Sequence, residues 1–88
     1  MGATTRAWRT IAQRVRLERR PCWLCGRHID YTLQWPNRWS YSCDHRVPTF
    51  HGGSDTYDNA EAAHLHCNTS RQAGLLRASV AATRTDTH

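Results

Sequence analysis

Two short ligand pairs with the same spacing constrain this sequence more than any other feature. Cys22 and Cys25 form a Cys-x-x-Cys pair, and His64 and Cys67 form a His-x-x-Cys pair, with residues 26–63 between them. Three thiolates and one imidazole in a tetrahedral arrangement are typical ligands of a structural zinc ion. The spacing therefore predicts one zinc site that joins two distant parts of the chain.

Other assignments of the cysteines stay open at this point. His66 or Cys43 could replace one member of the set, and the cysteines could instead remain free or pair as disulfides. A chain of 88 residues buries only a small core, so we expect an additional staple such as a metal or disulfides. Zinc binding adds on the order of 10 kcal/mol to the folding of small domains. Cys43 is most simply interpreted as a buried free thiol.

Apolar periodicity predicts a helix over residues 5–19. Trp8, Ile11 and Val15 recur at spacings of three and four and so share one face. Thr4 or Thr5 is suited to cap the start of this helix, and Pro21 ends the pattern.

The rest of the chain predicts short elements within a single domain, residues 1–88. A strand is expected over 40–47, and a helix from 67 to about 80 is followed by a frayed end at 81–88. For residues 59–66 the sequence does not decide between a strand and a helix, because residues 60–63 have poor strand propensity. Trp35, Trp39 and Tyr41 are interpreted as packing residues, with base stacking as the alternative.

The charge of the chain favours an anionic partner. The formal net charge is +5, and all 12 basic residues are arginine, whose planar fork fits phosphate. For the arginines of the first helix, a solvated helix face is the alternative to phosphate contact. The coding bias of a GC-rich genome could explain the absence of lysine, but it does not remove the positive charge. No apolar run approaches the roughly 20 residues that a membrane span needs, and no secretory signal is expected.

A second series of residues is interleaved with the ligand pairs. Its members follow in the order Asp44-His45, Pro48, Gly52-Gly53, Asn59 and Asn68. Each recurs often by chance, but their order and spacing between the two ligand pairs are specific. From Cys22 to Arg71 the chain resembles the HNH endonucleases, in particular the small stand-alone type common in phage and bacterial genomes.

The resemblance implies an α+β fold of the ββα-metal (His-Me finger) type, with an N-terminal helix and one structural zinc. It assigns residues 59–66 as the second strand. It also implies that His45 is the general base, that Asp44 binds a catalytic divalent ion, and that Asn59 orients His45 through a backbone contact. The third signature position, most often His, is Asn68, whose oxygen favours Mg²⁺ or Mn²⁺. We expect a backbone carbonyl to hold the second ring nitrogen of His45.

The function that follows is metal-dependent hydrolysis of DNA phosphodiester bonds, in the cytoplasm of a bacterium or phage-infected cell. Four arginines are candidates for phosphate contacts: Arg46, Arg71, Arg16 and Arg20. A phage DNA-packaging terminase is a candidate partner, which would make the chain an accessory nuclease active only in a complex. The alternative from another class is a zinc-stapled nucleic-acid-binding module without catalysis.

Overall fold

The computed structural model describes the backbone of residues 5–86 and the side chains of residues 5–78. In chain order the elements are α1 (Arg6–Glu18), β1 (Tyr41–His45), the 3₁₀ turns η1 (Thr49–His51) and η2 (Tyr57–Asn59), β2 (Ala60–His64) and α2 (Leu65–Asp86). Neither α1 nor α2, over the part of the chain described, is long and apolar enough to cross a membrane.

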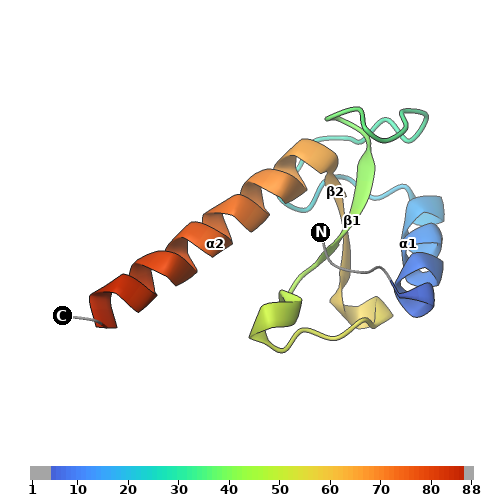
Figure 1. The fold of residues 1–88 in the computed structure, drawn as a ribbon. Helices are drawn as coiled ribbons and strands as arrows, with labels where there is room; N and C mark the ends of the chain where they lie inside the picture. Colours follow the sequence, from blue (N-terminus) through green and yellow to red (C-terminus); the bar gives the residue numbers. More distant parts are fainter. Residues whose placement is uncertain (1–4, 87–88) are drawn as a thin grey trace.

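A two-stranded antiparallel hairpin forms the centre of the fold. Tyr41 pairs with His64 at one end and His45 pairs with Ala60 at the other. The two helices lie on opposite sides of this hairpin, and α2 extends well beyond it (Figure 1). The arrangement confirms the predicted α+β class.

Helix α1 packs its apolar stripe against the hairpin. Trp8 and Val15 are buried, and Ile11 packs against the same core. The side chain of Thr5 caps the helix by accepting a hydrogen bond from the backbone N–H of Trp8 at 3.0 Å. The helix ends where Arg19 adopts a left-handed conformation, with φ of 51°.

The second strand is shorter than predicted, and the last helix is longer. β2 ends at His64, and Leu65 and His66 already belong to α2, whose first N–H groups donate to the carbonyls of Ser40 and Arg38 at 2.8 Å. The first backbone N–H groups of a helix have no partner within the helix, and these two carbonyls accept hydrogen bonds from them. As a result, α2 can begin directly at the end of β2. The sequence predicted a frayed end from residue 81, but α2 continues to Asp86. Residues 87–88 lie outside the part of the chain that the structure describes.

The core is small and contains few large apolar side chains. Ala60, Ala62 and Ala63 of β2 are buried, which explains why residues of poor strand propensity form a strand between two helices. The interpretation of the aromatic residues as packing residues was wrong for Trp35, which is 72% exposed. Trp39 is 47% exposed, but its ring makes edge contacts with those of His64 and His66, and Tyr41 packs against the core. Trp35 and Trp39 both belong to the loop before β1.

Candidate functional site

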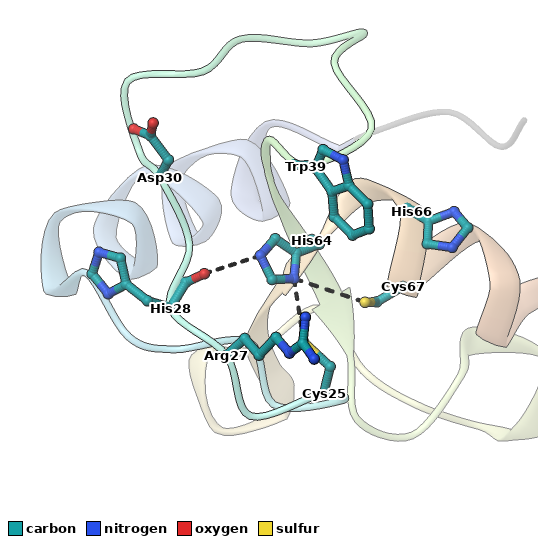
Figure 2. A pocket seen from close by; sticks show the side chains of 8 residues that line it. All are labelled: Cys25, Arg27, His28, Asp30, Trp39, His64, His66 and Cys67. Atoms are coloured by element: carbon teal, nitrogen blue, oxygen red, sulfur yellow. Dashed lines mark hydrogen bonds between the residues drawn. The ribbon is translucent and has the colours of Figure 1, made fainter.

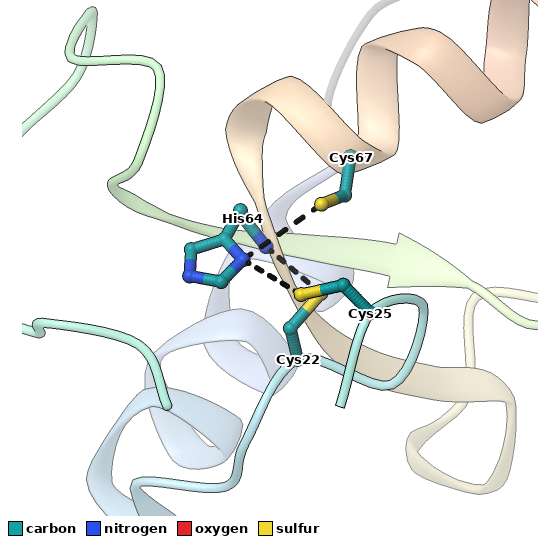
Figure 3. Close-up of side chains that lie close together, drawn as sticks. All are labelled: Cys22, Cys25, His64 and Cys67. Atoms are coloured by element: carbon teal, nitrogen blue, oxygen red, sulfur yellow. Dashed lines mark hydrogen bonds between the residues drawn. The ribbon is translucent and has the colours of Figure 1, made fainter. Parts of the chain in front are cut away.

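Four side chains from three segments converge at the end of the hairpin where β2 meets α2. The ligand atoms of Cys22, Cys25, His64 and Cys67 all lie within 4.8 Å of one another (Figure 3). His64 Nδ1 is 3.4 Å from the sulfur of Cys25 and 3.8 Å from that of Cys67. A tetrahedral zinc site has sulfur and nitrogen ligands about 3.6 Å apart, given the usual bond lengths. The cluster is therefore compatible with a structural zinc ion.

A tight turn positions the first two ligands. The backbone N–H of Gly26 donates to the carbonyl of Cys22 at 2.8 Å, and Gly26 has φ of 77°, a conformation that favours glycine. The N–H of Trp23 donates to the carbonyl of Ala62 at 2.9 Å. This bond attaches the turn to β2, whose last residue is the third ligand, His64.

His64 is oriented by its second ring nitrogen. Nε2 lies 3.1 Å from the backbone carbonyl of His28, to which it can only donate, so Nδ1 faces the sulfurs with a free lone pair. Burial opposes ionisation of Cys22, but hydrogen bonds from the backbone of Cys25, His64 and Leu24 lower its pKa to about 7. Both features suit a thiolate–imidazole metal site.

An open pocket of about 600 Å³ lies beside the cluster (Figure 2). Trp39 and His66 line this pocket. His66 Nδ1 lies 3.2 Å from a guanidinium nitrogen of Arg38, and His66 is not part of the cysteine–histidine cluster. Cys43 is half-buried in β1, and burial raises the pKa of its thiol to about 11. Within the described residues, the structure thus assembles the ligand set predicted from the spacing and neither competing set.

Asp44 lies near the other end of β1, and its carboxylate is fully buried. Trp23 Nε1 donates to it at 3.0 Å, and Arg71 of α2 donates to both of its oxygens at 3.2 and 3.0 Å. Arg71 also donates to the carbonyls of His45 and Arg46. Burial raises the pKa of Asp44, against the hydrogen bond from Trp23 and the charge of Arg71. In this structure Arg71 provides the positive charge that balances Asp44.

Asn68 lies on the same side of the hairpin as Asp44. Its amide nitrogen donates to the hydroxyl of Ser42 at 3.0 Å, and Ser42 is two residues before Asp44 in β1. Residues two apart in a strand share a face, and Asn68 and Arg71 share a face of α2. The carboxylate of Asp44 and the amide oxygen of Asn68 are donors that fit a hard divalent ion, provided that Arg71 releases Asp44.

His45 faces the opposite side of the hairpin, toward α1. Its Nε2 lies 2.7 Å from Asp55 Oδ1, and its ring stacks on Trp8 with centroids 3.7 Å apart and an angle of 8°. A carboxylate thus takes the place of the backbone carbonyl expected at this nitrogen. Neither partner was found from the sequence, because both contacts join segments that are separated along the chain.

Asn59 clamps the loop between β1 and β2. Its amide nitrogen donates to the carbonyls of Val47 and Ser54, each at 3.0 Å, and its oxygen accepts from the N–H of Val47 at 2.8 Å. The backbone carbonyl of Asn59 accepts from the N–H of Arg46 at 2.9 Å. These bonds fix the backbone that directly follows His45.

The arginines predicted to contact phosphate all make contacts within the chain. Arg16 donates to the carbonyl of Tyr31 at 2.7 Å. Arg20 and Arg46 both contact the carboxylate of Glu61, and Arg20 also contacts Glu18. Like Arg71, these three arginines are therefore paired within the chain in this structure, and phosphate contact by any of the four stays a prediction.

Comparison with known proteins identifies the family. The family model described as HNH endonuclease matches residues 22–74, which include the cysteine–histidine cluster, both strands and the start of α2. No curated protein and no solved structure matches the chain. The family's function is that of a metal-dependent nuclease, and HNH nucleases act on DNA. Because the match covers more than half of the sequence, the chain belongs to the HNH endonuclease family, as the ordered motifs predicted.

Proposed function

We propose that this protein is a DNA endonuclease in which His45 is the general base for phosphodiester hydrolysis. The observation that carries the proposal is the environment of His45 within a matched HNH domain. One ring nitrogen is held by Asp55 at 2.7 Å, and no hydrogen-bond partner faces Nδ1 within the residues that the structure describes. A histidine held in this way has one nitrogen fixed and the other available.

The chemistry requires a base near neutral pH. As the oxygen of a water molecule attacks phosphorus, the water loses a proton to His45 Nδ1. The bond from phosphorus to the 3′ oxygen then breaks, and the departing oxygen takes a proton from solvent. Histidine suits the first of these steps because its ordinary pKa lies close to working pH.

Asp44 and Asn68 are proposed to hold the divalent ion, with Mg²⁺ or Mn²⁺ as the ions best suited to oxygen ligands. Such an ion supplies charge stabilisation to the phosphate and the departing oxygen. Asp44 is balanced by Arg71 in the structure, so Arg71 has to give up these contacts to the ion. The released guanidinium is then available for a DNA phosphate, as the sequence suggested.

DNA binding is supported by the positive charge of the chain. A net charge of +5 favours phosphate contacts that do not depend on base sequence. Arg46 keeps 56% of its side chain exposed beside His45, which makes it the best placed of the predicted arginines. The proposed setting is the cytoplasm, and a phage terminase remains the proposed partner on the basis of the family resemblance.

The test is cleavage of supercoiled plasmid by the purified, zinc-loaded protein with Mg²⁺ or Mn²⁺. His45→Ala is compared with wild type, and His51→Ala is the matched control, because His51 is an exposed histidine of the adjoining loop. Zinc content is measured for every variant to establish that the fold is retained. We expect open-circle or linear DNA from wild type and His51→Ala, and intact plasmid from His45→Ala.

Each other outcome points to a different function. Equal cleavage by His45→Ala and wild type would refute the assignment of the base. Plasmid that is retarded in a gel but uncut by all three proteins would favour the non-catalytic binding module. Cleavage that appears only after a packaging terminase is added would favour the partner-dependent nuclease.

A further inference from the structure

The imidazole of His45 is held by groups outside the signature residues. Trp8, which precedes the family-matched span, stacks on one face of the ring. Asp55, from the loop between η1 and η2, contacts Nε2 at 2.7 Å. The stack restricts the plane of the ring, and the carboxylate selects its rotation within that plane.

Asp55 is itself held in place. Thr5 Oγ1 donates to Asp55 Oδ2 at 3.0 Å, and the same oxygen accepts the first capping bond of α1 from Trp8. One threonine therefore links the start of α1 to the carboxylate that contacts His45. Hydrogen bonds from His45 and Thr5 lower the pKa of Asp55, so the side chain is a carboxylate over the neutral pH range.

We propose that Asp55 is a positioning residue for His45, an inference that rests on the proposed function of His45 as the base. A carboxylate can only accept hydrogen bonds, so in the neutral ring Nε2 carries the proton. Nδ1 then has a lone pair for the proton of the attacking water. Once Nδ1 has taken that proton, the ring is an imidazolium, and the charge of Asp55 stabilises it at the moment when it forms.

A purely structural role for Asp55 makes a different prediction. The side chains of His45 and Asp55 are 19% and 33% exposed, and ion pairs in contact with solvent contribute little to stability. Loss of Asp55 should therefore leave the fold intact and reduce the chemical step. If the pair were structural, its loss would lower stability and have no specific effect on turnover.

The experiment compares Asp55→Ala, Asp55→Asn and Asp58→Ala, each loaded with zinc. Asp58 is an exposed aspartate of η2, three residues after Asp55, and is the matched control. We expect Asp55→Ala to lower kcat by about 10- to 100-fold, which is less than the roughly 100- to 10,000-fold effect of a general base. KM, zinc content and melting temperature should stay near wild type. Asp55→Asn keeps an acceptor oxygen and should restore part of the activity.

Two further readouts decide whether Asp55 acts through His45. In a His45→Ala background, at the higher protein concentration needed to detect residual cleavage, Asp55→Ala should cause no additional loss, whereas independent effects would multiply. Histidine-ring NMR should show a proton on Nε2 of His45 that is protected from exchange in wild type, Asp55→Asn and Asp58→Ala, and not in Asp55→Ala. A multiplicative loss, or an NMR signal unchanged in Asp55→Ala, would overturn the proposal. If wild type does not cleave DNA, the proposed function fails, and the NMR comparison still decides whether Asp55 fixes the ring.

Discussion

Replacement of Asn59 by aspartate tests whether one side chain holds the loop that follows His45. The two side chains have nearly the same shape, but the carboxylate has no N–H to donate. Asn59 is 8% exposed, and its amide nitrogen donates to the carbonyls of Val47 and Ser54 at 3.0 Å. In the variant, a carboxylate oxygen would face both carbonyl oxygens. The substitution therefore removes two bonds and adds repulsion in a site with little solvent.

The magnitude follows from the number of bonds. Each lost hydrogen bond costs about 0.5–1.5 kcal/mol, and a buried group without a partner costs about 1–3 kcal/mol. We expect Asn59→Asp to lower the free energy of unfolding by about 2–4 kcal/mol on this basis. Asn37→Asp is the matched control, because the Asn37 side-chain oxygen accepts from the N–H of Trp39 and a carboxylate can do the same. Its effect should stay within about 0.5 kcal/mol.

The assay is urea denaturation followed by far-UV circular dichroism. Free zinc must be held constant and saturating, because a ligand that binds the folded state adds to the measured stability. A shift of the midpoint at an unchanged slope indicates a change in stability alone. Equal midpoints for Asn59→Asp and Asn37→Asp would refute the clamp, since the two substitutions make the same chemical change.

Other predictions concern the metal cluster and two glycines. Cys25→Ser should lose zinc and melt at a much lower temperature, and chelation of zinc from the wild type should have the same effect. Cys43→Ser is the control and should retain zinc, because Cys43 lies outside the cluster. Metal analysis and thermal melts test both variants, and undiminished zinc in Cys25→Ser would exclude Cys25 as a ligand. Gly53→Ala should be strongly destabilising, because its Cβ would lie 1.7 Å from the carbonyl oxygen of Val47, whereas Gly74→Ala meets nothing within 4 Å. Gly74 lies in α2, so Gly74→Ala should stabilise the protein by about 0.5–1 kcal/mol. Similar melting temperatures for Gly53→Ala and Gly74→Ala would contradict the close contact between Gly53 and the carbonyl of Val47.

The elements that the sequence predicts best are those defined over short distances along the chain. The spacing of Trp8, Ile11 and Val15 places them on one helix face without knowledge of what they pack against. The members of the cysteine–histidine cluster follow from the two-residue gap within each pair, because such a gap lets both members reach one ion. Residues 60–64 are different: their composition leaves strand and helix open, and the strand forms because three alanines are buried between two helices.

The sequence by itself determined the ligand pairs, the first helix, the order of the signature residues and the family to which they belong. Tertiary structure alone decided which groups surround Asp44 and His45. Neighbours in a strand point to opposite faces, so Asp44 meets Arg71 of α2 and His45 meets Trp8 of α1. These contacts depend on where the two helices pack against the hairpin, which no local spacing specifies. For the same reason Asp55 became visible as the partner of His45 only once the loop had been placed beside the start of α1.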